Sequence, residues 1–204
     1  MSSPRSSARQ YGVALRAMLV FTVVLGVAYP LAITAFGQVA LPNQANGSLI
    51  TTGSGVAGSS LIGQSFTGAD GAALPEWFQS RPSAAGDGYD AAASGGSNLG
   101  PENADLITAI TARKSAIEDS DGVAAAQIPA DALTASASGL DPQISPEYAR
   151  LQVHRISVAR GLPVATVSAL VESRIQGRDL GFLGEPTVNV LQLNLALESL
   201  PGQG

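Results

Sequence analysis

The longest apolar stretch of the chain lies near its N-terminus, where Ala17–Phe36 holds twenty residues without a charge. An α-helix rises about 1.5 Å per residue, so about twenty apolar residues match a hydrocarbon layer of roughly 30 Å. A signal-peptide core is usually about 7–15 residues long, and no good small-residue cleavage site follows the run. The pattern therefore favours a retained membrane anchor over a cleaved signal peptide. Pro30 lies inside the run and predicts a kinked helix that continues to about Phe36.

The charges that flank this stretch predict its orientation. Arg5, Arg9 and Arg16 accompany its N-terminal end, and no basic residue follows it before Arg81. Cationic flanks resist translocation, so the N-terminus is expected in the cytoplasm. The predicted organisation is a cytoplasmic segment, 1–14, a transmembrane helix, 15–37, and a single extracytoplasmic domain, 38–204.

Beyond the anchor, the apolar pattern changes to short islands and then to helical spacing, which predicts an α+β domain. The islands predict short strands at Leu49–Ile50 and Leu61–Ile62, and a turn with a short strand within Ile128–Thr134. Helical spacing predicts four helices, of which the first follows Pro101 and carries Leu106, Ile110 and Ile117. The second begins at Ser145–Pro146–Glu147 and is closed by Gly161, and the third runs from Val164 to near Gly177. The fourth begins at about Asn189 and has Val190, Leu193, Leu197 and Leu200 on one face.

A long segment without such periodicity, Leu74–Pro101, lies between the islands and the first of these helices. It is rich in turn residues, and we name it the long loop. Loops of more than about fifteen residues are uncommon in compact domains unless they bind something, so this one is a candidate for function.

Composition narrows the function classes. The chain has 204 residues, a net charge of -5 and only 13% charged residues, which argues against a nucleic-acid-binding surface. It has no cysteine, which excludes disulfides, thiol nucleophiles and thiolate metal sites. About forty residues are used by the anchor region, so the remainder suffices for one domain with a core of its own.

No catalytic constellation stands out. His154 is the single histidine, and no Gly-x-Ser-x-Gly elbow supplies a nucleophile for it. The acidic residues show no metal-ligand spacing, so we expect no metal. The glycine-rich run Ser94–Gly100 could form an anion-binding concavity, but no Gly-Lys-Ser/Thr follows, so tight turns are the favoured interpretation. Similarly, Arg81 is expected to tie loops together rather than to bind an anion.

Four separated segments resemble, in order and spacing, the C subunit of the bacterial Kdp potassium-transporting ATPase. They are Trp77–Ala84, Ser94–Pro101, Thr134–Pro142 with Ile144–Pro146, and Leu183–Pro186 with Val188–Leu191 and Leu193–Asn194. The resemblance covers roughly residues 10 to 200. Two positions depart from the family: Trp77 stands where tyrosine is usual, and Gln143 stands where histidine or asparagine is common. Since glutamine cannot transfer a proton, Gln143 weakens any catalytic role for that position.

The resemblance implies an accessory subunit that is not itself an enzyme, joined to a channel-like potassium-binding subunit and a P-type ATPase subunit. It implies a role in assembly of that complex and suggests a catalytic chaperone that raises the ATP affinity of the pump subunit. No cofactor is expected to bind stably, and ATP is expected only through the complex. Direct ATP contact conflicts with the predicted topology, which places the domain away from the cytoplasm. Membrane lipid is a further expected partner, and nucleic acid is not. The alternative function is a stand-alone membrane-anchored binding domain, and an anchored hydrolase is a less favoured alternative.

Two sets of residues are the candidate sites. The partner- or nucleotide-related loop comprises Arg81, Ser83, Ser94, Gly95, Gly96, Ser97 and Asn98. The structural motif comprises Asp141, Gln143, Ser145, Glu185, Asn189 and Asn194.

Overall fold

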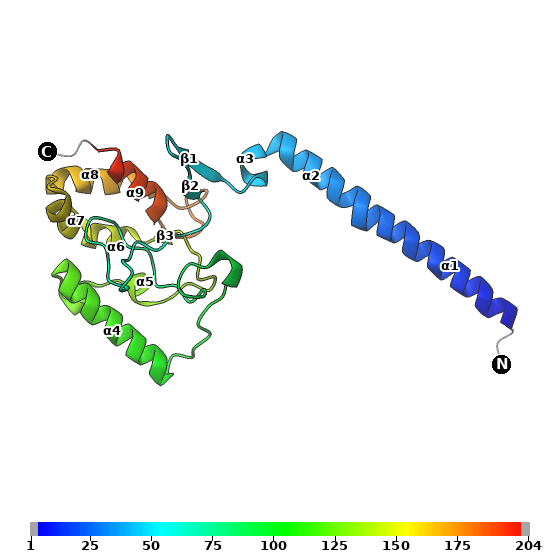
Figure 1. Ribbon diagram of the computed structural model, residues 1–204. Helices are drawn as coiled ribbons and strands as arrows, with labels where there is room; N and C mark the ends of the chain where they lie inside the picture. Colours follow the sequence, from blue (N-terminus) through cyan, green and yellow to red (C-terminus); the bar gives the residue numbers. More distant parts are fainter. Residues whose placement is uncertain (1–3, 201–204) are drawn as a thin grey trace. The chain divides into compact units, whose positions relative to one another are not determined.

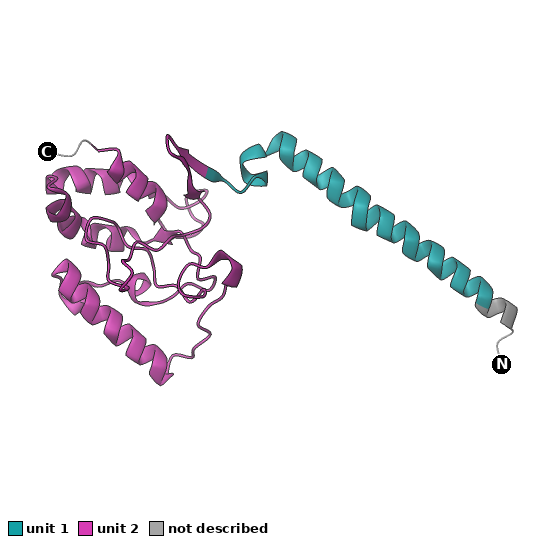
Figure 2. Cartoon of the chain, in the orientation of Figure 1, with its two compact units in different colours: residues 1–49 teal, residues 50–204 magenta. Residues whose placement is uncertain are grey.

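The structure is a computed structural model that describes residues 4–200, and the chain divides into two compact units, residues 1–49 and 50–204 (Figure 2). The outermost residues of the predicted cytoplasmic segment and extracytoplasmic domain, 1–3 and 201–204, lie outside the described residues. In order, the elements are α1 (Pro4–Val23), the π-helix η1 (Val24–Ala28), α2 (Tyr29–Ala40), α3 (Pro42–Ala45), β1 (Leu49–Thr52), β2 (Gly55–Ser59), the 3₁₀ turn η2 (Ala91–Ala93), α4 (Ala104–Asp121), the 3₁₀ turn η3 (Ala125–Gln127), α5 (Ala130–Leu133), β3 (Gln143–Ile144), α6 (Pro146–Leu151), α7 (Val153–Arg160), α8 (Val164–Arg174), β4 (Ile175–Gln176), β5 (Thr187–Asn189) and α9 (Val190–Glu198).

The first unit is a continuous apolar helix made of α1, η1 and α2 (Figure 1). In the described part of the chain it is the one helix long and apolar enough to cross a membrane, over Ala8–Ala40, and none of it is buried. The sequence predicted a kink at Pro30, and what the structure has just before it is the π-helical turn η1, where the N–H of Tyr29 bonds the carbonyl of Val24. Proline lacks an N–H and crowds the preceding turn, so a wider turn at this point relieves the helix.

A short helix, α3, follows the long helix after a break at Leu41. Its end is tied back to α2, because the Asn46 amide nitrogen donates to Gln38 Oε1 at 3.0 Å and to the Pro42 carbonyl at 2.6 Å. The connection toward β1 is thus partly folded.

The second unit confirms the predicted α+β class. Its larger sheet has three short antiparallel strands in the order β3-β5-β4, with Ile144 opposite Val188 and Ile175 opposite Val188. Helices α6, α8 and α9 pack against β5, and α4 packs against α5 and α7 (Figure 1). The fully buried side chains that join these layers include Phe78, Ile144, Ile156, Val167, Val171, Val188, Leu193 and Leu197.

Several predicted elements are confirmed by their caps. Ser145 Oγ accepts from Tyr148 N at the start of α6, with Pro146 in the first turn. Gly161 adopts a left-handed conformation, with φ 63°, and ends α7. Asn189 Oδ1 accepts from Gln192 N and begins α9.

Two predicted strands were wrong. Leu61–Ile62 does not form a strand; the second strand is Gly55–Ser59, which pairs with β1 because Gly53 and Ser54 allow the chain to reverse at once. Within Ile128–Thr134 the chain forms the helical turn α5, since Ala130, Ala132 and Leu133 favour helix and Thr134 Oγ1 bonds the Ala130 carbonyl.

Two predicted helices have different bounds. The helix from Ser145 to Gly161 is divided at Gln152 into α6 and α7, and the helix from Val164 ends at Arg174, where β4 begins. Pairing of Ile175 and Gln176 with β5 replaces the last predicted turn.

Candidate functional site

The long loop is fixed by amide side chains that pair with its backbone. Asn194 of α9 accepts from Phe78 N at 2.9 Å and donates to Phe78 O at 3.0 Å. Gln152, between α6 and α7, accepts from Gln79 N at 2.6 Å and donates to Gln79 O at 3.3 Å. Each amide takes the place of a neighbouring strand, which satisfies buried backbone groups that no sheet reaches.

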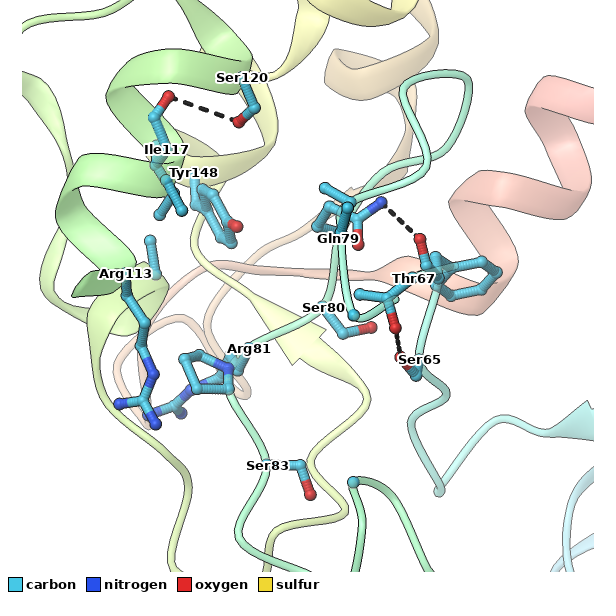
Figure 3. Close-up of a pocket in the computed structure, with 18 of the residues that line it drawn as sticks. Ser65, Thr67, Gln79, Ser80, Arg81, Ser83, Arg113, Ile117, Ser120 and Tyr148 are labelled. Atoms are coloured by element: carbon cyan, nitrogen blue, oxygen red, sulfur yellow. Dashed lines mark hydrogen bonds between the residues drawn. The ribbon is translucent and has the colours of Figure 1, made fainter. Parts of the chain in front are cut away.

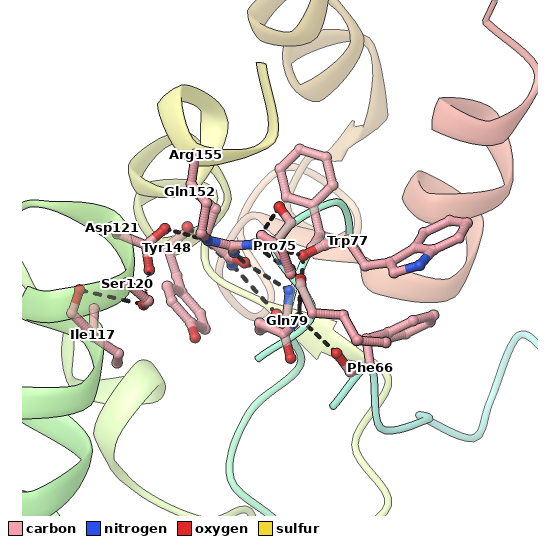
Figure 4. Close-up of polar contacts among 12 residues, drawn as sticks. Phe66, Pro75, Trp77, Gln79, Ile117, Ser120, Asp121, Tyr148, Gln152 and Arg155 are labelled. Carbon is pink, nitrogen blue, oxygen red and sulfur yellow. Dashed lines mark hydrogen bonds and ion pairs between the residues drawn. The ribbon is translucent and has the colours of Figure 1, made fainter. Parts of the chain in front are cut away.

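Arg155 of α7 is the centre of this buried polar network (Figure 4). Its Nε donates to Asp121 Oδ1 at 2.8 Å, and both side chains of this ion pair are nearly inaccessible to solvent. Its Nη1 donates to the carbonyls of Leu74, Pro75 and Trp77, and its Nη2 donates to Gln152 Oε1. One guanidinium therefore joins α4, α7 and the start of the long loop.

Arg81 and Ser83 join the middle of the long loop to the segment 134–141. Arg81 pairs with Asp141 at 2.9 Å and donates to Thr134 O at 3.4 Å. Ser83 Oγ donates to Gly139 O at 2.6 Å and accepts from Tyr89 N at 2.8 Å. Through these contacts Arg81 ties the long loop to the segment 134–141.

Tyr89 closes this part of the loop. Its hydroxyl donates to Arg81 O at 2.8 Å. Burial raises the pKa of Tyr89 to about 12, so the phenol is neutral and serves as a donor.

The glycine-rich run packs by its backbone. Gly95 N and Ser94 Oγ both donate to Ser138 O, at 2.9 and 3.0 Å. A Cβ on Gly96 would lie 3.0 Å from the Ala137 carbonyl oxygen, so the absence of a side chain permits the close approach. Ser97 and Asn98 are exposed, and Asn98 has a positive φ of 51°. The structure thus places Ser94–Gly96 in a loop-to-loop contact.

Most of the second residue set has contacts that hold local structure. Asp141 Oδ1 accepts from the backbone N–H of Gln143 in β3, and Ser145 donates to Asp131 Oδ1 at 2.8 Å. Asn189 Nδ2 donates to Ser60 O at 2.8 Å. Glu185 is exposed and pairs with Arg178.

Glu185 borders a short turn, Gly177–Gly184, which we name the exposed turn. Asp179 and Leu183 exchange backbone hydrogen bonds at 2.9 Å, so the turn is ordered by its own backbone. Leu180, which has a φ of 52°, and Phe182 are 82% and 69% exposed.

A cleft of about 570 Å³ lies between the long loop and α4 (Figure 3). Its polar lining includes Arg81, Ser83 and Tyr89 from the loop and Arg113 from α4. Burial raises the pKa of Tyr148, which also lines the cleft, above its usual range. Of the predicted loop residues only Arg81 and Ser83 line this cleft, and the run from Ser94 to Asn98 does not.

Several of these site residues were not predicted from the sequence. Gln152 and Arg155 are polar residues that share a buried helix face with Tyr148 and Ile156, and that interruption of an apolar face was an available signal. Nothing in the local pattern indicated Arg113, because its role depends on the position of α4 against the long loop.

The described residues show no other constellation for chemistry. His154 is exposed on α7, and no group of three or more His, Cys, Asp or Glu residues is placed to hold a metal within residues 4–200.

Comparison with known proteins gives consistent results. The sequence profile of the family described as "KdpC: K+-transporting ATPase, c chain" matches residues 11–199. Proteins named "Potassium-transporting ATPase KdpC subunit" are similar to this chain: that of Kineococcus radiotolerans is 53% identical over 94% of both chains, and that of Caulobacter vibrioides is 54% identical over 91% of both. The protein of Mycobacterium tuberculosis with the same name is 49% identical over 94% of this chain and 99% of its own length. A match of this extent means that the chain belongs to the KdpC family, the c chain of K+-transporting ATPases.

Proposed function

We propose that this chain is a non-catalytic accessory subunit that is required for assembly of an ATP-driven potassium uptake complex. The observation that supports it most strongly is the match to the family over residues 11–199, which includes both the apolar helix and the folded domain. The polar residues singled out in the domain are largely engaged in holding loops and helix ends, which agrees with an architectural role. The proposed partners are the channel-like potassium-binding subunit and the P-type ATPase subunit of the complex, together with membrane lipid.

We further propose that residues 1–14 are cytoplasmic, 15–37 span the membrane and 38–204 lie outside the cytoplasm. The arginines before the apolar run support this orientation. The chain has no cysteine, so a single cysteine at the exposed position Ala137 can be labelled without background. An impermeant maleimide should label it in intact cells; labelling only after lysis would reverse the proposed orientation.

In this proposal ATP is bound by the pump subunit, and any effect of this chain on ATP affinity is transmitted through the complex. The contact of Ser94–Gly96 with Ser138 and Ala137 supports a structural use of the glycine-rich run. Direct ATP contact by that run would require the opposite orientation, which the labelling experiment tests.

The apolar helix is proposed to be an assembly surface. Gly26 lies within the π-helical turn η1, which ends two residues before Pro30. Small residues such as glycine let membrane helices approach closely. A Cβ at Gly26 meets only Thr22 Cγ2, at 4.0 Å, so a larger side chain fits within its own helix.

The experiment is Gly26→Leu in the full chain, with recovery of the other subunits on the tagged chain as the measurement. We expect recovery of the complex to fall at least several-fold while membrane insertion is unchanged. Val20→Leu, at another exposed position of the helix, is the matched control and should leave recovery intact. Equal recovery for both variants would show that the helix is only a tether.

A further inference from the structure

The cleft between the long loop and α4 holds a guanidinium without a counter-charge. Arg113 Nη1 donates to Leu133 O at 2.8 Å, and Arg81 Nη2 donates to the next carbonyl, Thr134 O, at 3.4 Å. Asp141 pairs with Arg81, but Arg113 makes no ion pair in the described part of the chain. Figure 3 shows both arginines reaching the same side of the cleft.

The Arg113 side chain is also partly shielded from water. Burial lowers its pKa from the ordinary value, and no neighbouring charge opposes this. Arginine stays protonated in proteins, so the cost of this partial burial persists until an anion approaches.

Arg81, which also lines the cleft, has a second unused donor. Arg81 Nε is buried and has no hydrogen-bond partner in the described part of the chain. Buried polar atoms are nearly always satisfied, and an orphaned one points to a bound ion, water or ligand. Because Nε is an obligatory donor, the missing group must be an acceptor.

The carboxylates near the cleft do not neutralise the positive charge of Arg113. Asp121 is held by Arg155 and by Ser120. Asp119 lines the cleft and is exposed to solvent, where screening weakens its charge, so it lowers the affinity for an anion without neutralising Arg113.

The rest of the lining is largely apolar, with Phe66, Ala116 and Ile117 among its residues. Clefts that combine an apolar wall with a few convergent polar groups are the usual form of small-ligand sites. We propose that this cleft binds an oxyanion, a carboxylate or a phosphate, between the Arg113 guanidinium and Arg81 Nε. Such a group can arrive as a free anion or as a lipid headgroup, and the site does not depend on the function proposed above.

The test measures thermal unfolding of the full chain in nanodiscs of phosphatidylcholine, with sodium phosphate or sodium butyrate against sodium chloride at equal ionic strength. For a dissociation constant near ~10 mM, about 50 mM anion should raise the unfolding midpoint by roughly 2–4 °C. Phosphate stabilises many proteins by exclusion from their surface, so the difference between variants is the result that counts.

Arg113→Gln should abolish the anion-specific rise, and Arg113→Lys should restore part of it. Arg174→Gln removes the same charge from an exposed position on α8 and should behave as the unchanged chain. In a second arm, phosphatidylglycerol replaces part of the disc lipid without free anion. A rise there that Arg113→Gln removes identifies a headgroup as the source.

An equal rise in the unchanged chain and in Arg113→Gln, or no rise in any arm, overturns the proposal. Circular dichroism checks that each variant is folded. If Arg113→Gln is unfolded, Asp119→Asn decides: removal of the rim carboxylate should enlarge the anion-specific rise, and an unchanged rise overturns the site.

Discussion

The long loop and the exposed turn are both connections, yet they are held in opposite ways. The long loop has little regular structure but is fixed by buried side chains of distant helices, with Arg155, Gln152 and Asn194 bonded to its backbone. The exposed turn is fixed by its own backbone and presents Leu180 and Phe182 to solvent. The difference teaches that a glycine-rich loop can be part of the core architecture, while a short regular turn can carry the free apolar surface.

The largest effect should come from breaking the network that holds the long loop. Arg155→Met removes the partner of the buried Asp121 carboxylate and the guanidinium hydrogen bonds to three loop carbonyls. Two of these carbonyls keep a donor in Gln79 Nε2, and that of Pro75 does not. Loss of one member of a buried ion pair costs about 3–5 kcal/mol. Urea unfolding of the full chain measures this, with Arg150→Met, from an exposed ion pair, as the control. A cost below about 1 kcal/mol would mean that the long loop is held by its other contacts.

A smaller effect is expected where the long loop touches the segment 134–141. Gly139 has a φ of 67°, and a Cβ there would lie 2.7 Å from Gly95 O and 2.8 Å from Ala85 N. Gly139→Ala adds left-handed strain and a backbone clash, so we expect a loss of about 2–3 kcal/mol in unfolding free energy. Gly100, where a Cβ meets nothing within 4 Å, is the matched site for an alanine control. Equal losses at both positions would refute close packing of the glycine-rich run.

The smallest effect should come from the exposed turn. Phe182→Ser removes an apolar side chain that contributes little to the core, so the unfolding free energy should change by less than about 0.5 kcal/mol. Phe78→Ser, at a fully buried phenylalanine, should cost about 3–5 kcal/mol in the same urea experiment. A large loss for Phe182→Ser would show that the turn supports the domain and would erase the contrast between the two connections.

Sequence predicted the parts of this fold that local physics decides. The apolar run, the serine and asparagine caps at Ser145 and Asn189, and the terminating Gly161 each act within a few residues. The strand predicted at Leu61–Ile62 and the conformation predicted for Ile128–Thr134 were wrong, because short segments have weak preferences that neighbouring turns override.

The candidate site was predicted in part. Arg81 makes the loop contacts that the sequence predicted, and its partner Asp141 lay in the other predicted set. The cleft that Arg113 and Tyr148 line together with the long loop was not predictable. It depends on how α4 and α6 pack, and no local motif indicates it. Glu185 and Gln143 showed no contact that distinguishes a functional role from a structural one.

The folded connection after the long helix has a consequence for association. Leu41–Ser48 could extend about 28 Å as an open chain, but with α3 formed it reaches only about 20 Å. A short tether confines the domain to a small volume around the end of its helix, which corresponds to an effective concentration in the millimolar range. If the helix packs among partner helices as proposed, even a weak surface on the domain would find its target as an intramolecular event. Replacing α3 with a flexible linker would therefore lower the effective concentration of the domain at its target.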